Sequence, residues 1–403
     1  MKISLIIPTR ERATYLKESL KTALAIDDKN VEIVVSDNAS LDNTKDVVEE
    51  FSDARLKYFR SNERVSMRAN FENGLRKSTG DYVSFIGDDD GYLSGQFESL
   101  RILLEKERPD NITWVPVSYS WPEAQGEHSK LKIRRRNVFG PPKEIDCERQ
   151  RHDLLAGTLE PQGAAPAIYH GIAAREFVNR ISSSSGVCFN GSIPDIFFGY
   201  RSILEGGKFL RVHHPFSMPG RSNASTGAAQ SSGSDPSAGQ NSGVLFGQEN
   251  QSDDLRDIID YALSVPLALF STLETTIERF PIAGQRPDYR EWYAYVLDSC
   301  KGRSEADKRS IHSILAQHAI DKGITPLFET AKKRKPAKRS AGERLAREIS
   351  NIRSIKIDSK LNDTDNIVTA TGALDVVLGN EYKDILLNRK SRSAAWKAAK
   401  ERS

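Results

Sequence analysis

The run Tyr-Val-Ser-Phe-Ile at residues 82–86 leads straight into three consecutive carboxylates, Asp88, Asp89 and Asp90. Its aromatic and β-branched content, with glycines on either side, predicts a short buried strand that ends in a loop. Three adjacent carboxylates repel one another, so a fold gathers them at the end of a buried strand when a cation or a basic partner neutralises them. The alternative is an acidic surface turn, although such turns usually join polar segments.

A calcium loop of the EF-hand type does not fit these acids. Counting from Asp88 places Leu93 where that loop requires Gly and Ser99 where it requires Glu. What remains is a small set of oxygen ligands on a hard cation with open positions, which is how magnesium or manganese is held against substrate phosphates. We therefore predict a site for Mn²⁺ or Mg²⁺ at the end of this strand.

The chain of 403 residues carries a formal charge of +3, which decides little about its partners. Its length suffices for two domains, or for one large domain with an appendage. We expect no membrane span and no signal peptide, because the sequence lacks a run of about 18 apolar residues and begins with a strand-like segment. Cys147, Cys188 and Cys300 are widely spaced and odd in number, which argues against a disulfide framework or a thiolate metal site and favours a reducing cytoplasm.

Apolar strand-like runs and amphipathic helical segments alternate in the N-terminal part of the chain. These segments are residues 3–7, 13–26, 31–35, 43–51, 56–59, 67–77 and 82–86. The nearly continuous apolar content of the first run is typical of a strand buried on both faces. The sequence therefore predicts an α/β fold with an open, mostly parallel sheet and flanking helices.

In such a sheet, ligands bind beyond the carboxyl ends of the strands. Thr9, Asp37 and the acids at 88–90 each follow a predicted strand, so we expect them at one edge of the sheet. No GxGxxG follows the first strand and no GxxxxGK(S/T) occurs near the N-terminus. Neither a dinucleotide dehydrogenase nor a P-loop enzyme is therefore indicated.

Three segments resemble those of a known family. They are Ile-Ile-Pro-Thr-Arg-Glu-Arg at 6–12, Ser-Asp-Asn-Ala-Ser-Leu-Asp-Asn-Thr at 36–44, and the stretch 70–90 that ends in the three acids. In this order they resemble the signatures of family 2 glycosyltransferases of the GT-A fold, strongly over about the first 100 residues and more loosely to about residue 225. The resemblance implies transfer of a sugar from a nucleotide-diphosphate donor to an acceptor hydroxyl, normally with inversion and with a divalent cation.

The resemblance implies that a set of residues contacts the donor nucleotide: Pro8, Thr9, Glu11, Asp37, Arg68, Asp88 and Asp89. Asp37 would accept a hydrogen bond from the imide N–H of the base, although its surroundings are also plain turn chemistry. Arg68 would reach a phosphate, with solvation on a helix surface as the alternative. The sequence departs from the family just after Arg68, because Asn70-Phe71-Glu72 stands where many relatives carry Ala-Arg-Asn.

Asp88 and Asp90 would be the two acids of the Asp-x-Asp motif and hold the metal, with Asp90 as the inner ligand. A departing nucleoside diphosphate develops negative charge, which a cation held by one or two carboxylates stabilises. In GT-A enzymes a late histidine sometimes completes the metal shell. His213 or His214, in a strand predicted over 209–215, is the candidate, with packing or surface exposure as the alternative.

Asp195 is the candidate general base. It follows Pro194 at the start of an apolar helix, and in relatives with this Pro-Asp arrangement the acid at the head of the acceptor-side helix takes the acceptor proton. An inverting displacement needs one such carboxylate, because the metal handles the leaving phosphate. The structural alternative is a helix-capping acid. Asp81 and Asp153 are placed less favourably for this role.

The middle of the chain is less regular. Residues 111–119 predict a strand, and residues 168–172 and 174–181 predict a strand and a helix. Between them lies a polar excursion over 120–166, of the kind on which acceptor recognition is often built. Its three arginines at 134–136 are candidates for contact with an anionic acceptor or with membrane lipid, or form a solvated charge run.

Residues 217–243 are mainly Ser, Gly, Ala, Asn and Gln with hardly a hydrophobe. Such a segment cannot offset the entropy of its own ordering by burial, so we expect a flexible loop. Its position suggests a lid over the donor, with Arg221, Ser222 and Ser225 as phosphate contacts.

The C-terminal part reads as helical. An amphipathic pattern runs from 252 with Pro266 as a kink, and more helices follow to about residue 330. The basic run at 332–339 precedes a predicted helix whose apolar face is formed by Leu345, Ile349, Ile352 and Ile355. This arrangement suits an anionic membrane surface, and a solvated linker with a docking helix is the alternative. Residues 356–403 allow no prediction.

We thus predict a GT-A domain over 1–245, with a nucleotide-binding half at 1–110 and an acceptor-binding half at 111–245, and a mainly helical region at 246–403. The predicted function is inverting, metal-dependent glycosyl transfer in bacterial polysaccharide or glycoconjugate synthesis. We expect a saccharide or lipid-linked acceptor, a cytoplasmic location with contact to the inner face of the membrane, and no nucleic-acid partner. The rivals are a sugar-phosphate nucleotidyltransferase and a non-catalytic sugar-nucleotide binder.

Overall fold

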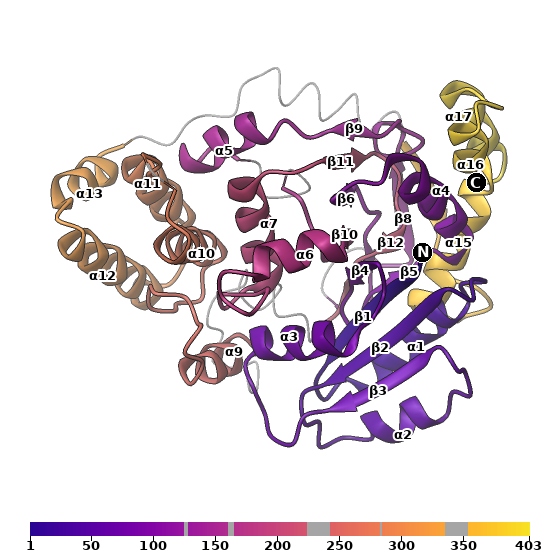
Figure 1. Ribbon diagram of the computed structural model, residues 1–403, viewed down its shortest axis with the longest axis horizontal. Helices are drawn as coiled ribbons and strands as arrows, with labels where there is room; N and C mark the ends of the chain where they lie inside the picture. The colour runs from indigo at the N-terminus through magenta and orange to yellow at the C-terminus, as the bar shows by residue number, and fades with distance from the viewer. Residues whose placement is uncertain (125–127, 160–164, 224–241, 283, 335–353) are drawn as a thin grey trace.

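The eight-stranded sheet at the centre of the molecule has the strand order β3-β2-β1-β4-β10-β6-β11-β9 (Figure 1). A computed structural model describes residues 1–403 except 125–127, 160–164, 224–241, 283 and 335–353. The strands are β1 (Ile3–Thr9), β2 (Val31–Asp37), β3 (Leu56–Arg60), β4 (Tyr82–Phe85), β6 (Asn111–Trp114), β9 (Lys143–Glu144), β10 (Gly171–Ala174) and β11 (Phe209–Val212).

Within this sheet β1 pairs in parallel with β2 and β4, β2 with β3, and β6 with β11. The strands β10 and β9 run antiparallel to their neighbours. The prediction of an open, mostly parallel α/β sheet is confirmed. The strand expected over 111–119 ends at Trp114, and the strand and helix expected over 168–181 begin later, at Gly171 and Arg175.

Strand β1 is apolar throughout because both of its faces are covered. Leu5 and Ile7 join one core with Leu20 of α1, whereas Ile6 joins a second core on the other face with Phe71 of α3. The first face carries α1 (Ala13–Leu24), α2 (Thr44–Glu49) and α4 (Phe97–Glu107), and the second α3 (Met67–Lys77), α6 (Arg175–Ser182) and α7 (Pro194–Glu205). This three-layer packing fixes where the strands end.

A bundle of four helices packs beside α7 and α5 (Cys147–Leu155), around a separate apolar core. Its helices are α10 (Val265–Arg279), α11 (Tyr289–Ser299), α12 (Glu305–Asp321) and α13 (Thr325–Lys332), drawn in orange tones in Figure 1. The predicted kink at Pro266 is wrong, because Pro266 lies in the first turn of α10 and the residues before Ser264 are not helical. A proline is tolerated there because the first-turn N–H groups lack helical partners.

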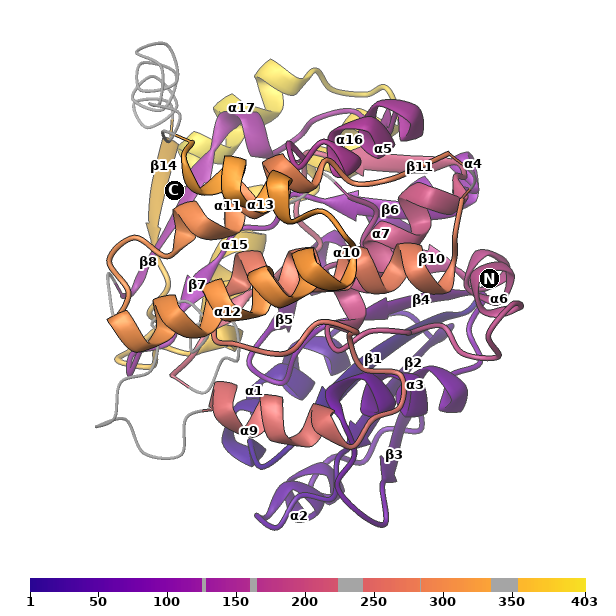
Figure 2. The same ribbon diagram turned by 90° about the vertical axis from the view of Figure 1, so that its left-hand side faces the viewer.

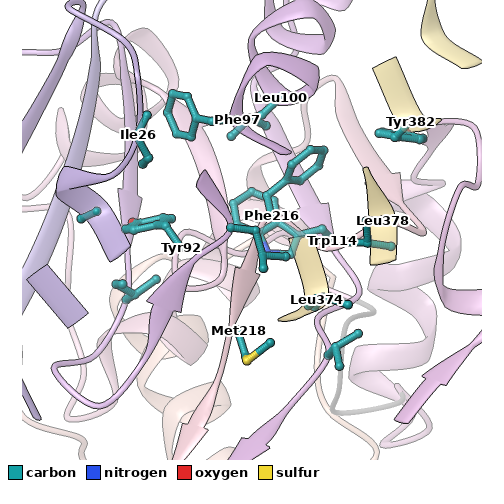
Figure 3. Packing of buried hydrophobic residues seen from close by; sticks show 14 of the residues in the cluster. Ile26, Tyr92, Phe97, Leu100, Trp114, Phe216, Met218, Leu374, Leu378 and Tyr382 are labelled. Atoms are coloured by element: carbon teal, nitrogen blue, oxygen red, sulfur yellow. The ribbon is translucent and has the colours of Figure 1, made fainter. Parts of the chain in front are cut away.

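The last part of the chain returns to the sheet. Strand β14 (Ser354–Asp358) pairs antiparallel with β8 (Lys130–Arg134), and α15 (Ile367–Leu378), α16 (Glu381–Leu386) and α17 (Arg392–Glu401) follow. Figure 3 shows Leu374, Leu378 and Tyr382 beside Phe216 and Trp114 in the first core. In Figure 1 these yellow elements lie on the opposite side of the sheet from α11–α13.

This packing divides residues 246–403 differently from the single helical region that the sequence predicts. Residues 354–403 share the core of the α/β domain, whereas α10–α13 form their own core. Ile355 lies in β14 and not in a helix, and Leu345, Ile349 and Ile352 lie outside the described residues. In the part of the chain that the structure describes, no helix is both long and apolar enough to cross a bilayer.

Two small ribbons and one further helix complete the surroundings of the strand ends. Strand β5 (Gly91–Tyr92) pairs with β12 (Ser217–Met218), and β7 (Tyr119–Ser120) pairs with β13 (Gly220–Arg221). Helix α9 (Ser242–Gln251) lies beside α3 (Figures 1 and 2). The loop expected over 217–243 therefore begins in strands and ends in a helix, and Ser225 lies outside the described residues.

Candidate active site

A cavity of about 1040 Å³ lies where β1 and β4 end, at the carboxyl edge of the parallel strands. Its volume is at the upper end of the range of small-molecule sites. The polar part of its lining consists of Thr9, Arg10, Arg12, Asn38, Asn70, Asp88, Asp89, Asp90, Ser118, Tyr119, Ser120, Tyr169, His170, Asp195, Arg221 and Glu249. Acids, arginines and a histidine therefore face one space.

The cavity gathers some of the predicted site residues and leaves others out. Those that line it are Pro8, Thr9, Asp88, Asp89, Asp90, Asp195 and Arg221. Those that do not are Glu11, Asp37, Arg68, Ser222, His213 and His214. The predicted residues that line the cavity come from the ends of strands and from the start of α7, and helices α3, α9 and α10 supply further lining residues.

Asp88 is held by two partners from the end of β1 and the residues after it. Thr9 Oγ1 donates a hydrogen bond to Asp88 Oδ2 at 2.8 Å, and Arg12 Nη1 lies 3.0 Å from Asp88 Oδ1. Burial alone would lower the pKa of Arg12, but the charges of Asp88 and Asp89 raise it. Both carboxylate oxygens of Asp88 are therefore engaged by the protein, and its role as a metal ligand stays a prediction.

Asp89 is buried and its pKa is raised to about 7, by burial first and then by the charges of Asp90 and Asp88. Ser222 Oγ donates a hydrogen bond to its Oδ2 at 2.6 Å. Trp121 Nε1 donates to its backbone oxygen at 2.9 Å. Asp89 therefore links the acidic loop to the segment around β13. Ser222 contacts Asp89 and does not line the cavity.

Asp90 is the most enclosed of the three acids. Its Oδ2 accepts hydrogen bonds from Gly87 N at 2.7 Å and from Tyr169 Oη at 2.5 Å, and its Oδ1 accepts one from Gly220 N at 2.8 Å. Burial by itself would raise the pKa of Asp90, but His170, Tyr169 and the Gly220 amide together lower it. The fold thus keeps a charged carboxylate at the end of β4.

His170 and Asp90 fit an open metal site. His170 Nε2 lies 3.1 Å from Asp90 Oδ2, is buried, and makes no aligned hydrogen bond with a described residue. Its Nδ1 lies 2.7 Å from Ser217 Oγ, which accepts a hydrogen bond from Trp114 Nε1 at 2.9 Å. A proton on Nδ1 would leave the Nε2 lone pair free for a metal.

Two protein ligands leave the other positions of Mn²⁺ or Mg²⁺ for water and phosphate oxygens. Among the described residues no set of three or more His, Cys, Asp and Glu forms a closed metal site. Such a closed set is typical of structural metals, whereas catalytic metals keep open positions. The residues present therefore fit a metal that is completed by its substrate.

The two predicted histidine candidates are placed elsewhere, which corrects that expectation. His214 is fully buried, with Nε2 3.0 Å from Gln96 Oε1 and its ring stacked on Tyr382. Burial lowers its pKa to about 3. His213 Nδ1 lies 3.0 Å from the Arg136 carbonyl oxygen. His170 was missed because it lies within residues 168–172, which read as an ordinary strand.

The other residues predicted to contact the donor make internal contacts. Asp37 accepts hydrogen bonds from Tyr58 Oη at 2.6 Å and from Ser40 N at 3.0 Å, which is the turn chemistry named as its alternative. Its neighbour Asn38 lines the cavity instead. Glu11 has a left-handed φ of 53° and forms an ion pair with Arg64.

Arg68 is buried and pairs with an acid from a distant part of the chain. Its Nε lies 2.7 Å from Asp253 Oδ2, and Ser66 Oγ also donates to Asp253. A second such pair joins Arg10 to Glu249 of α9, and both of these residues line the cavity. Neither acid could be identified from its local sequence, because both belong to a segment that was interpreted as an appendage.

Asp195 lies in the first turn of α7, and its carboxylate lines the cavity. Burial raises its pKa, while the backbone amides of Asp195 and Ile196 and the nearby His170 act in the opposite direction. An acid with a raised pKa is a stronger base once it is ionised. The role of Asp195 as the general base stays a prediction.

An open, mostly parallel sheet with such a cavity at its strand ends is the layout of a GT-A transferase. Residues 4–157 match the profile of the family described as "Glycosyl transferase family 2". The predicted resemblance to family 2 glycosyltransferases is confirmed over this part of the chain. The chain is therefore similar to enzymes that transfer sugars.

Curated relatives agree with this match over short segments. The "GalNAc(5)-diNAcBac-PP-undecaprenol beta-1,3-glucosyltransferase" of Campylobacter jejuni is 40% identical over 102 residues, covering 25% of this chain and 33% of that protein. The "Glycosyltransferase GlyA" of Streptococcus pneumoniae is 31% identical over 127 residues, covering 31% of this chain and 18% of that protein. The alignments thus span a third of these relatives or less.

Two solved structures were matched at low similarity. Staphylococcus aureus TarS 1–349 in complex with UDP-GlcNAc has a TM-score of 0.45 at 13% identity, covering 83% of this chain and 91% of that chain. The mannosyltransferase PcManGT from Pyrobaculum calidifontis, in complex with GDP-Man and Mn²⁺, has a TM-score of 0.39 at 14% identity, covering 87% of each chain.

Proposed function

We propose that the protein is an inverting, metal-dependent glycosyltransferase that moves a sugar from a nucleotide-diphosphate donor to an acceptor hydroxyl. The observation that carries the proposal is the shared cavity of Asp90, His170 and Asp195, at the strand ends of a family 2 domain. A charged carboxylate with an adjacent histidine suits a metal ion that would bind the leaving diphosphate. A separate acid suits the acceptor.

On the donor side, Mn²⁺ or Mg²⁺ bound by Asp90 and His170 would stabilise the negative charge that develops on the leaving diphosphate. Arg10 and Arg221 line the same cavity and supply further positive charge. Thr9 and Arg12 hold Asp88 in place, which fixes the start of the acidic loop. The nucleoside would lie against Pro8 and Asn38 at the end of β1 and β2.

On the acceptor side, Asp195 would take the proton from the acceptor hydroxyl as its oxygen attacks the anomeric carbon. The bond to the β-phosphate oxygen breaks as the new glycosidic bond forms, so a single displacement inverts the anomeric centre. The start of α7 would hold Asp195 on the acceptor side of the reaction, away from the leaving diphosphate. Tyr119 and Ser120 of β7 line the cavity and would contact the acceptor.

The acceptor class is proposed to be a saccharide or a lipid-linked saccharide, within bacterial polysaccharide or glycoconjugate synthesis. The name of the Campylobacter relative, which acts on an undecaprenol-linked acceptor, supports the lipid-linked alternative. The predicted location, the cytoplasm with contact to the inner face of the membrane, stays a prediction. So does the absence of a nucleic-acid partner.

The test is a panel of UDP-, GDP- and dTDP-sugars incubated with the protein and Mn²⁺, with proton NMR of the anomeric signal of the released or transferred sugar. We expect turnover of one donor class with inversion, and loss of turnover with EDTA. Retention of configuration would refute the single displacement. Formation of nucleotide sugar from a nucleoside triphosphate and a sugar phosphate would favour a nucleotidyltransferase.

A further inference from the structure

The ribbon formed by β8 and β14 has one apolar face and one basic face. Leu131, Ile133, Ile355 and Ile357 alternate along the two strands and point into the core. The positions between them place Lys130, Lys132, Arg134 and Lys356 on the outer face. These four residues are called the basic ribbon below.

The register of the sheets places like charges directly opposite one another. Lys132 faces Lys356 across the β8–β14 pair, and Lys143 faces Arg211 across the β9–β11 pair. Like charges in opposed positions destabilise a sheet. Lys132 and Arg211 each make a further interaction, so the argument for an anionic partner rests on the other basic residues of the ribbon.

The turn between the two edges is also basic and is held rigidly. It contains Arg135 and Arg136, and Arg392 Nη2 donates hydrogen bonds to the carbonyl oxygens of Arg135, Arg136 and Val138 at 2.9, 3.2 and 3.1 Å. Burial lowers the pKa of Arg392, and the charge of Arg135 lowers it further. These cations are thus close enough to repel one another.

Several of these cations have no acidic partner among the described residues. In the described part of the chain, Lys130, Arg134, Arg136, Lys356 and Arg392 form no ion pair with a carboxylate. The acids nearest in register are Asp358, opposite Lys130, and Glu144, beside Lys143. The net charge of the face is therefore strongly positive.

The far end of the ribbon carries an exposed apolar side chain. Leu361 follows β14 in a tight turn closed by Thr364, and 64% of its surface is exposed. Its neighbour Lys360 is exposed as well. An apolar tip beside lysines is typical of a segment that rests in the interfacial region of a membrane.

The same end of the ribbon lies close to the cavity. Asp365 accepts hydrogen bonds from Ser129 Oγ at 2.7 Å, just before β8, and from Tyr119 Oη at 3.0 Å. Tyr119 lines the cavity. A surface bound along the ribbon would therefore lie beside the acceptor wall of the site.

We propose that the basic ribbon, its continuation at Arg135, Arg136 and Arg392, and the tip at Leu361 form a docking face for a membrane that contains anionic lipids. The face is an antiparallel ribbon without outward aromatic side chains in its strands, which suits a planar layer of headgroups better than stacked bases. The binding does not depend on the proposed transfer reaction. Presentation of a lipid-linked acceptor to the wall at Tyr119 does rest on that proposed function.

The test is co-sedimentation of the full chain with vesicles of phosphatidylcholine that contain phosphatidylglycerol, and with vesicles of phosphatidylcholine alone. We expect binding to the anionic vesicles that weakens as salt is raised. The triple variant Lys130→Gln, Arg134→Gln, Lys356→Gln should bind on the order of 100-fold more weakly, because each basic residue near the surface contributes about 5-fold. Its thermal midpoint should match that of the wild type, because these three side chains form no ion pair in the described part of the chain.

A matched control removes the same charge from elsewhere on the surface. Lys29, Lys106 and Arg309 are exposed, and the structure gives them no ion pair. Their triple Gln variant should bind the anionic vesicles nearly as tightly as the wild type does, because the proposed binding depends on the local docking face and not on the net charge of the protein. The variant Leu361→Ser should weaken binding several-fold even at high salt, since it removes the apolar contact.

Equal loss of binding in the basic-ribbon and control variants would overturn the proposal, as would wild-type binding by the basic-ribbon variant. Binding of a single-stranded RNA homopolymer through the ribbon, without binding to the anionic vesicles, would replace the lipid partner with nucleic acid. Nucleoside-diphosphate affinity of the basic-ribbon variant, measured by calorimetry, should stay unchanged. The proposal of a docking face can therefore fail while the proposal of a donor site stands, and the reverse also holds.

Discussion

Glu249 of α9 forms an ion pair with Arg10, the residue that follows β1, and both side chains line the cavity. The carboxylate of Glu249 therefore neutralises Arg10, one of the arginines that face the proposed diphosphate. A bound donor phosphate would compete with Glu249 for this cation.

The variant Glu249→Gln should bind a nucleoside diphosphate about 2- to 5-fold more tightly, since the competing ion pair is of the partly exposed kind. Isothermal titration with the diphosphate measures this. Asp254→Asn is the matched control, because Asp254 is exposed a few residues away and the structure gives it no ion pair. Weaker binding by Glu249→Gln would mean that Glu249 helps to hold the donor.

The proposed metal ligand His170 is tested against His213, which lies outside the cavity. His170→Ala should weaken Mn²⁺ binding on the order of 10-fold or more, because it removes the nitrogen beside Asp90. His213→Ala should leave it unchanged. Electron paramagnetic resonance of free Mn²⁺ gives both affinities, and equal values for the two variants would remove His170 from the metal site.

The general base is tested with Asp195→Asn, for which we expect a fall in kcat on the order of 100-fold or more with unchanged donor affinity. Asp153→Asn, an alternative acid on α5, is the control and should be nearly normal. If Asp195 merely caps α7, its Asn variant should also be nearly normal, since Asn caps almost as well.

The pH dependence follows from the same residue. Because burial raises the pKa of Asp195, the base becomes ionised at a higher pH than an ordinary Asp, whose pKa is about 3.9. Transfer should therefore increase with pH through an acid limb above that value. A profile whose limb lies at or below the ordinary pKa of Asp would contradict the assignment.

Asp253 predicts how stability depends on pH. Burial alone would raise its pKa, but hydrogen bonds from Arg68 and Ser66 lower it below its ordinary value. The stabilisation is therefore fully present above the unfolded-state pKa and is lost as the pH falls through the folded-state pKa. Over this acidic range, the thermal midpoint of Asp253→Asn should depend less on pH than that of the wild type. An equal slope of midpoint against pH in the two proteins would show that Asp253 makes no such contribution.

The C-terminal helices support the acidic loop from behind. A Cβ on Gly91, the residue after Asp90, would lie 2.8 Å from Ile367 Cγ1 and 3.0 Å from Thr371 Cγ2 of α15. Gly91→Ala should lower the free energy of unfolding by about 1 to 3 kcal/mol through overpacking, and reduce transfer. Gly372→Ala in the same helix is the control, because a Cβ there meets no atom within 4 Å. Equal melts for the two variants would mean that α15 does not support the loop.

The sequence predicted those parts of the fold that local patterns determine. Residues 3–7 and 31–35 are strands because continuous apolar runs of that length need burial on both faces. The acids after β4 were found because three adjacent carboxylates at the end of a buried strand require a partner that neutralises their charge. Asp195 was found because Pro194 marks the start of its helix.

The remainder depends on contacts between distant segments. The pairing of Arg68 with Asp253, and the return of β14 to β8, join positions whose local sequence carries no trace of the partner. His170 was missed because its role comes from the position of Asp90 and not from its own neighbours. Periodicity also read residues 252–264 as helix, although Ser264 and Pro266 start the helix later.

Calorimetric titration of UDP, GDP and dTDP into the wild type and Asp90→Asn, each with Mn²⁺ and with EDTA, tests the central claim most directly. The exposed Asp27→Asn serves as the control for a lost carboxylate. We predict that one diphosphate binds the wild type and Asp27→Asn more tightly with Mn²⁺ than with EDTA, and that Asp90→Asn loses this difference while keeping its thermal midpoint. Metal-independent binding by the wild type, or a full Mn²⁺ effect in Asp90→Asn, would contradict a metal-dependent donor site at Asp90.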